Sequence, residues 1–155
     1  MDVNVLGNVH FINFFMPLVL QSPIKKVAII SSGMGDAEMA SQYEIWLSSI
    51  YSTSKAAVNM ITAKYQAQYK KDGVLFLSIC PGMVDVGHYA PGEMTPRQLQ
   101  GLEYLVSRFK EYEPNFAGPD KPEDSVKSVL SVIENSTVEK NAGNYLSHFG
   151  TKKWI

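Results

Sequence analysis

The residues of this chain that are best suited to chemistry are a tyrosine and a lysine four positions apart, Tyr51 and Lys55. At the start of a helix, side chains with this spacing lie on the same face. A free phenol has a pKa near about 10, too high for a base at neutral pH, and a nearby ammonium group lowers it by stabilising the phenolate. The pair could therefore act as a general acid or base. Because the chain contains eight tyrosines, the alternative is a coincidence on a solvent-facing helix.

Two predicted strands bring further polar groups close to this pair. Residues 27–31 and 74–80 are short apolar runs, typical of strands that are buried on both faces of a parallel sheet. The first run leads into Ser32, and the second is broken by a Pro-Gly pair. Ligands of α/β sheets bind at the carboxyl ends of parallel strands. We therefore expect Ser32, Tyr51 and this break to converge on one rim of the sheet.

The pattern of the remaining chain indicates an α/β fold. Helices are predicted at residues 2–20, 52–71, 96–112 and 122–134. A last short strand is predicted at residues 144–146. Strands separated by helices of this length predict parallel pairing with right-handed crossovers. The length suits a single domain over residues 1–155, and the first helix is expected to be buried on a wide face.

Composition and charge exclude two classes of partner. The formal net charge is −1 and the pI is about 6.3, and the lysines and arginines form no basic stripe, so we expect no nucleic-acid partner. Residues 11–20 are apolar but too short to span a membrane, and they lack the features of a signal peptide. We therefore expect no membrane partner.

Cysteine and histidine usage gives two further expectations. Cys80 is the single cysteine, so no intramolecular disulfide forms, which fits a reducing compartment and predicts a cytoplasmic location. Cys80 also ends an apolar run, which predicts a buried structural thiol. His10, His88 and His148 lie far apart in the sequence and have no metal-ligand spacing, so no metal site is expected.

Four segments, taken together and in this order, resemble the short-chain dehydrogenases/reductases. They are Asn4-Val5-Leu6-Gly7, the strand with Ser31-Ser32-Gly33, the motif YSTSKAA at residues 51–57, and ICPGMVD at residues 79–85. The resemblance covers almost the whole chain and is similar in detail to members common in filamentous fungi. It implies a partial Rossmann-like, doubly wound parallel sheet that lacks its N-terminal strands. It also implies an NAD(P)-dependent oxidoreductase that reduces a carbonyl or oxidises an alcohol.

The resemblance implies catalytic roles for Asn4, Ser32, Tyr51 and Lys55. Tyr51 would give or take the proton of the reacting oxygen, and Lys55 would hold the nicotinamide ribose and lower the pKa of Tyr51. Ser32, rather than Ser31, would hydrogen-bond the substrate oxygen, because the family's serine is usually the second of such a pair. Asn4 would anchor a water that connects Lys55 to solvent; the alternative for Asn4 is a helix N-cap.

The cofactor implied by the resemblance is NADP or NAD, and the substrate is a small carbonyl compound or alcohol. Pro81, Gly82 and Val84 would contact the cofactor together with Tyr51 and Lys55. Residues 83–119 would form a lid over the substrate, and their side chains suggest an apolar or aromatic ligand or, equally, simple helix packing. The side chains in question are Tyr89, Met94, Leu102, Tyr104, Leu105, Phe109 and Phe116.

Three features depart from the family pattern. No G-x-x-x-G-x-G turn is present to hold the cofactor pyrophosphate. Val86 stands where the family usually has a threonine, so a hydroxyl group for the cofactor is lost. Residues 38–50 look like an insertion, in which Trp46, Leu47 and Ile50 either line a substrate pocket or cap the core; we favour the core.

These departures leave several readings open. The chain is the catalytic half of an oxidoreductase whose cofactor half lies elsewhere, or an inactive truncated relative that acts as an interaction or dimerisation partner, or a fragment of a longer gene product. The strand at residues 27–31 would then have an open edge. In the family, the helices that carry Asn4 and Tyr51 form a dimer interface, which implies a homodimer here.

Overall fold

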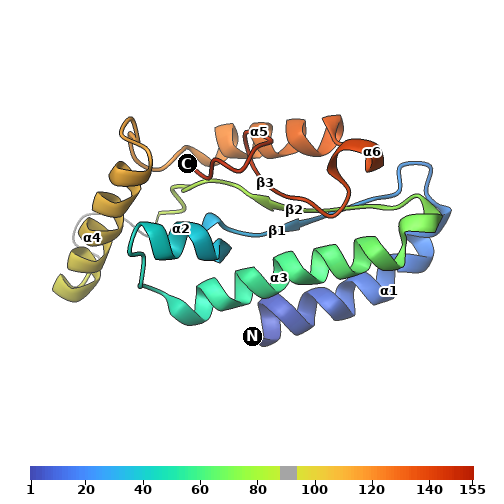
Figure 1. Ribbon diagram of the computed structural model, residues 1–155, viewed down its shortest axis with the longest axis horizontal. Helices are drawn as coiled ribbons and strands as arrows, with labels where there is room; N and C mark the ends of the chain where they lie inside the picture. Colours follow the sequence, from blue (N-terminus) through green and yellow to red (C-terminus); the bar gives the residue numbers. More distant parts are fainter. Residues whose placement is uncertain (88–93) are drawn as a thin grey trace.

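The computed structural model describes residues 1–87 and 94–155, and its centre is a parallel sheet (Figure 1). The strands are β1 (Lys26–Ile30), β2 (Leu75–Cys80) and β3 (Tyr145–Ser147), in the spatial order β1-β2-β3. All neighbours pair in parallel, with Val27 beside Phe76 and Ile79 beside Leu146. The predicted α/β class with parallel strands is confirmed.

Helices cover both faces of this sheet. On one face lie α1 (Asn8–Gln21), which continues a π-helical stretch η1 (Asp2–Gly7), and α3 (Ser49–Gln68). On the other face lie α5 (Pro122–Asn135) and the short α6 (Val138–Asn141). At the carboxyl ends of the strands lie a 3-10 turn η2 (Gly33–Gly35), α2 (Ala37–Gln42) and α4 (Pro96–Tyr112). A second 3-10 turn, η3 (Lys70–Asp72), follows α3.

The central strand β2 carries the core. All six of its residues are buried, because it has a strand on each side and helices on both faces. Phe76 stacks on the ring of Tyr65 from α3 at a centroid distance of 5.5 Å, and Leu77 packs on the opposite side with Val129 from α5. This burial fixes the position of the carboxyl end of β2, and with it the position of the Pro81-Gly82 break that follows.

The edge strand β1 differs from the prediction that both of its faces are buried. Ile29 is buried, whereas Ala28 and Ile30 are exposed, and Ile30 keeps 49% of its surface. These two residues of β1 are exposed because, among the described residues, helices cover one side of the strand and no strand pairs with its outer edge. The open edge that the sequence predicts is therefore present in the described part of the chain.

The first helix also differs from the prediction, because it is buried on a narrow face only. Ile12 and Met16 are buried, whereas Phe11, Phe14 and Leu18 are 65%, 77% and 63% exposed. The continuous helical stretch Asp2–Gln21 is 20 residues long, with only 11% of its apolar window buried. By length and composition alone it is able to cross a membrane, a test that core helices and signal sequences also meet.

Candidate active site

Tyr51 and Lys55 lie one turn apart near the start of α3. The Lys55 ammonium nitrogen is 5.7 Å from the centroid of the Tyr51 ring. It donates a hydrogen bond of 2.9 Å to the carbonyl oxygen of Ile30, which ties α3 to the carboxyl end of β1. Burial lowers the pKa of Lys55. The pair therefore stands at the predicted rim, with the tyrosine ring partly exposed to a cavity.

The two serines after β1 point in different directions. Ser31 is buried, and its hydroxyl donates to the Asn59 side-chain oxygen at 2.6 Å, so it faces α3. Ser32 lines the same cavity as Tyr51, and its Oγ accepts a hydrogen bond from the backbone N–H of Met34 at 3.3 Å. Of the two, Ser32 is thus the serine that shares a cavity with Tyr51.

Asn4 lies inside η1, where it connects the first helix to α3. Its amide nitrogen donates to the Ser54 hydroxyl at 3.0 Å, and that hydroxyl donates to the carbonyl oxygen of Tyr51 at 2.7 Å. The N-cap of this helical stretch is Met1, so the alternative of Asn4 as an N-cap is wrong. Asn4 instead contacts the turn that bears Tyr51 and Lys55, and its role in binding a water stays a prediction.

The cavity beside these residues has a volume of about 310 Å³. Ser32 and Tyr51 border it on one side, and Gly82 and Val84 border it where the chain leaves β2. Pro81 does not line it. Val86, at the position of the family's threonine, does not line it either, and its side chain is 60% exposed.

The thiol of Cys80 holds two loops of the site together. Its sulfur accepts a hydrogen bond from the backbone N–H of Gly33 at 3.0 Å and from that of Gly82 at 3.4 Å. Burial raises the pKa of this thiol, which keeps it neutral. The predicted buried structural thiol is confirmed, and its contacts show what it supports.

Three further residues support Ser32, and the sequence reading assigned them no role. The Tyr145 hydroxyl donates to the carbonyl oxygen of Ser32, and burial strongly raises the pKa of Tyr145. The Tyr145 ring stacks on that of Trp154 with centroids 4.1 Å apart. The Trp154 indole N–H donates to the Asp36 carboxylate at 2.9 Å, and Asp36 also caps α2. The feature of the sequence that could have pointed to this support is Trp154, a large aromatic residue directly after the polar residues 151–153.

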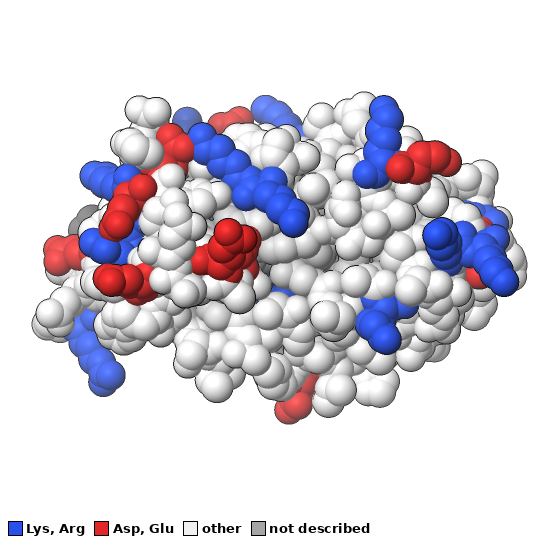
Figure 2. Space-filling model, viewed as in Figure 1, with Lys and Arg blue, Asp and Glu red and all other residues white. Residues whose placement is uncertain are grey.

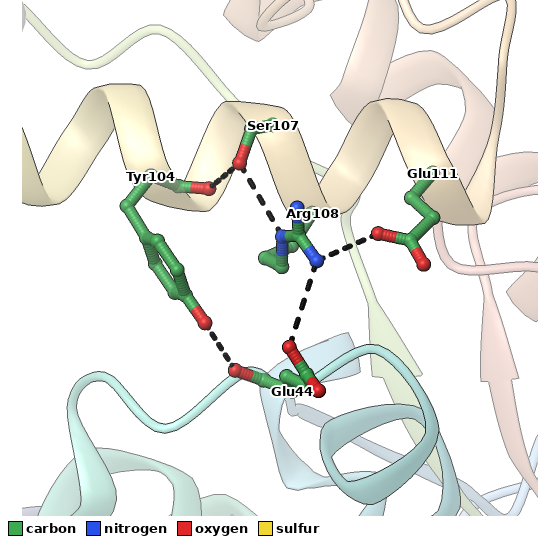
Figure 3. Close-up of polar contacts among 5 residues, drawn as sticks. All are labelled: Glu44, Tyr104, Ser107, Arg108 and Glu111. Atoms are coloured by element: carbon green, nitrogen blue, oxygen red, sulfur yellow. Dashed lines mark hydrogen bonds and ion pairs between the residues drawn. The ribbon is translucent and has the colours of Figure 1, made fainter.

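A polar clasp joins α4 to the segment between α2 and α3 (Figure 3). The Tyr104 hydroxyl donates to the carbonyl oxygen of Glu44 at 2.6 Å. The Arg108 guanidinium lies 2.7 Å from the Glu111 carboxylate and 3.8 Å from that of Glu44. The Trp46 ring packs on Tyr104 with centroids 5.5 Å apart. These contacts hold α4 beside the cavity, which its residues Leu105 and Phe109 help to line.

The expectations for the segment 38–50 are wrong in detail. Trp46 and Ile50 are 70% and 72% exposed, so they neither line the cavity nor cap the core. Met39 and Ser48 line the cavity instead: Met39 lies on the buried side of α2, and Ser48 directly precedes α3. Part of the expected lid, including Tyr89, lies outside the described residues.

A buried histidine stands behind the Pro81-Gly82 break. His148 is 5% exposed, and its Nε2 is 3.7 Å from the Asp120 carboxylate. Burial lowers the pKa of His148. A side chain on Gly82, whose φ is +84°, would come within 2.7 Å of the His148 ring. Among residues 1–87 and 94–155, no cluster of three metal-ligating side chains occurs.

Charged side chains are dispersed over the face of the molecule that Figure 2 shows. Lysines and arginines alternate with acidic groups on this face and form no continuous basic stripe.

Comparison with known proteins gives concordant results. The family described as short chain dehydrogenase matches residues 1–93. The chain is 47% identical over 154 residues to the short chain dehydrogenase virK of Hypocrea virens and 44% identical over 153 residues to the short-chain dehydrogenase/reductase iacC of Pestalotiopsis fici. It covers 99% and 98% of its own length in these matches but only 56% of each relative, so it spans little more than half of them.

Solved structures of similar fold have bound dinucleotides. An NADPH-bound carbonyl reductase from chicken fatty liver matches with a TM-score of 0.70 and 19% identity, covering 96% of this chain and 52% of that one. A short chain dehydrogenase from Mycobacterium paratuberculosis bound to NAD matches with a TM-score of 0.71 and 20% identity, covering 100% of this chain and 55% of that one. At these identities, the likeness establishes the fold.

Proposed function

This chain belongs to the short-chain dehydrogenase family, and we propose that it carries the substrate-binding and proton-transfer side of an NAD(P)-dependent oxidoreductase. The reaction would reduce a carbonyl group or oxidise an alcohol. The observation that supports this most directly is that Ser32 and Tyr51 line one cavity, with Lys55 one turn further along the same helix.

In the reducing direction, Ser32 and Tyr51 would hold the substrate oxygen between them. The Ser32 oxygen already accepts the Met34 N–H, so its own hydrogen is free to be donated to the substrate oxygen. Tyr51 would transfer its phenolic proton to that oxygen as negative charge develops there. A nicotinamide cofactor, when bound, supplies the hydride that adds to the carbonyl carbon.

Lys55 would assist this proton transfer electrostatically. One of its three N–H groups is used on Ile30, which fixes the ammonium group 5.7 Å from the Tyr51 ring centroid. A positive charge at this place would stabilise the negative charge that proton transfer leaves on the Tyr51 oxygen. The two remaining N–H groups are available to a ribose hydroxyl.

The residues present fit the nicotinamide end of a dinucleotide. Gly82 and Val84 border the cavity next to Tyr51, and their backbone follows the carboxyl end of a central parallel strand, where such ligands bind. None of the 155 residues forms a G-x-x-x-G-x-G turn for the pyrophosphate. We therefore propose that a complete cofactor site needs residues beyond these 155, in keeping with relatives of nearly twice this length.

Titration of NADPH and NADH against the purified chain, followed by cofactor fluorescence, tests the proposal. Binding in the micromolar range with turnover of an aryl ketone would support an active oxidoreductase site in this polypeptide. Absence of binding at millimolar cofactor would exclude activity of the chain alone. The same measurement on the chain joined to the N-terminal half of a relative would then decide whether the site works when completed.

A second candidate function is that of a dimerisation partner, which is favoured by the exposed apolar face of α1. Phe11, Phe14 and Leu18 are all more than 60% exposed, and such a continuous patch often marks an interface. We propose a homodimer through α1 and α3, the helices that follow Asn4 and carry Tyr51. Sedimentation velocity should then detect a dimer, and Phe14→Glu should shift it to monomer. A monomer at all concentrations would exclude this partner.

A further inference from the structure

The cavity beside Ser32 and Tyr51 is walled by uncharged side chains throughout the part of the chain that the structure describes. Its apolar wall comes from η2, α2, α4, the loop after β2 and the C-terminal segment. The residues concerned are Met34, Met39, Met83, Leu105, Phe109 and Trp154. None of the described lining residues is an aspartate, glutamate, lysine, arginine or histidine.

The charged side chains nearest to this wall each have a hydrogen-bond or ion-pair partner in the fold. The Lys55 ammonium donates to the Ile30 carbonyl oxygen, and the Asp36 carboxylate accepts from the Trp154 indole and from the start of α2. Arg108 lies on the same helix as Leu105 but forms ion pairs with Glu111 and Glu44 (Figure 3). Lys55 keeps its charge and two N–H groups, but it stands beside Tyr51 and does not line the cavity, so a charged ligand group lying against α4 would find no counter-ion among these side chains.

An ionised group that enters such a cavity without a partner loses its hydration and gains little in return. An uncharged oxygen, in contrast, meets the hydroxyl groups of Ser32 and Tyr51 at one end of the cavity. The volume of about 310 Å³, part of which the nicotinamide end of a bound cofactor would occupy, lies at the small end of the range of roughly 300–1,000 Å³ for small-molecule sites. One polar end and an apolar remainder fit a compact ring compound with a single carbonyl group.

Building on the proposed function, we infer that the substrate is an uncharged, compact aromatic or alicyclic ketone or aldehyde, or the corresponding alcohol. Its oxygen lies at Ser32 and Tyr51, and its ring lies against Leu105 and Phe109 of α4. These two residues are four positions apart on one face of the helix, so they form one continuous wall. Leu105 and Phe109 are thus specificity-determining residues, held in place by the clasp of Tyr104 and Arg108.

Binding of three probes of similar shape tests the inference independently of turnover. Acetophenone and para-acetylbenzamide are uncharged, and para-acetylbenzoate is the charged analogue of the amide. Ligand-observed NMR titration of the purified chain should give dissociation constants at least tenfold lower for the two uncharged ketones than for the carboxylate. Equal affinity for amide and carboxylate would overturn the inference, and so would the absence of binding of all three.

A variant that carries a charge in the apolar wall tests the same inference from the side of the protein. Leu105→Arg should improve binding of para-acetylbenzoate at least tenfold and weaken that of acetophenone. Leu99→Arg adds the same charge to an exposed position of α4 outside the cavity and should leave the preference unchanged. An equal response of both variants would show that the wall does not select the ligand. Selective binding without any NAD(P)H-dependent turnover, even by the chain joined to the N-terminal half of a relative, would reject the proposed function while leaving the ligand class intact.

Discussion

The hydroxyl of Tyr145 donates a hydrogen bond to the backbone carbonyl oxygen of Ser32, 113 positions earlier in the chain. Tyr145 begins β3, the last strand, and its ring is held from the other side by Trp154. The loop that carries the proposed substrate-binding serine is therefore fixed by the C-terminal part of the fold. The placement of Ser32 opposite Tyr51 depends on this support.

Tyr145→Phe removes this hydrogen bond and keeps the ring stack. We expect the free energy of unfolding to fall by about 1 kcal/mol, the usual net worth of one hydrogen bond. Urea denaturation measures the change. Tyr43→Phe is the control, because the Tyr43 hydroxyl forms no hydrogen bond within the part of the chain that the structure describes. An equal loss in both variants would contradict the supporting role of Tyr145.

Tyr51→Phe removes the proposed acid. In a form of the protein that turns over substrate, we expect kcat to fall by roughly 100- to 10,000-fold, the usual contribution of a general acid. Loss of nicotinamide absorbance measures the rate. Tyr69→Phe, just beyond the other end of α3, should keep the rate of the unmodified protein. Full activity of Tyr51→Phe would refute the proton-transfer role.

Gly33→Ala tests the close packing behind the site. An added Cβ would lie 2.7 Å from the Trp154 Cβ, in a core with no room to accommodate it. Overpacking of this kind costs about 1–3 kcal/mol. Gly101→Ala in α4 meets open space and should instead stabilise the helix by about 1 kcal/mol. Thermal unfolding of both variants should move in opposite directions, and a shift in the same direction would contradict the packing argument.

His148 should make stability depend on pH. Because burial lowers its pKa in the folded state, the unfolded chain binds the proton more readily once the pH falls below the ordinary histidine value of about 6.5. The free energy of unfolding should therefore decrease as the pH falls from about 6.5 to the lowered folded value. The nearby Asp120 carboxylate offsets part of this effect, since it favours the charged imidazole.

Urea denaturation across about pH 5 to 8 measures this dependence. His148→Gln should flatten the curve in that window, whereas His10→Gln, at an exposed position of α1, should keep it. A curve that is unchanged by His148→Gln would assign the acid sensitivity to other groups.

Tyr104→Phe tests the clasp on α4. Loss of the hydrogen bond to the Glu44 carbonyl should weaken acetophenone binding severalfold, because α4 is then held less firmly beside the cavity. Arg108→Gln should have a smaller effect, since ion pairs with exposed carboxylates such as that of Glu44 contribute about 0–1 kcal/mol and are screened by salt. Ligand-observed NMR at low and high salt separates the two. An effect of Arg108→Gln larger than that of Tyr104→Phe would reverse this ranking.

Much of the fold was predictable because its central elements have simple patterns. The apolar run at residues 74–80 can only be a buried strand or a short buried helix, and the Pro-Gly break after it favours a strand. Thr95 followed by Pro96 similarly marks the start of α4, where the structure has a full capping box. The Tyr51–Lys55 pair was predictable because its spacing is local.

The remaining features depend on contacts that local patterns do not contain. The helical stretch Asp2–Gln21 is apolar almost all round, so its periodicity does not reveal which face is buried. The support of Ser32 by Tyr145 and Trp154 joins segments more than a hundred positions apart. Trp46 is 70% exposed and packs on Tyr104 at the surface, a contact that no property of its own segment predicts.

The double contact of the Cys80 sulfur has a mechanical consequence. One atom at the end of the most buried strand binds the backbone of the loop at Gly33 and of the loop at Gly82. Because both loops bind the same sulfur, neither can move relative to the other without stretching one of these two hydrogen bonds. The distance between the Gly33 side and the Gly82 side of the cavity is therefore set by the protein interior, so any ligand that enters meets a gap of preset width.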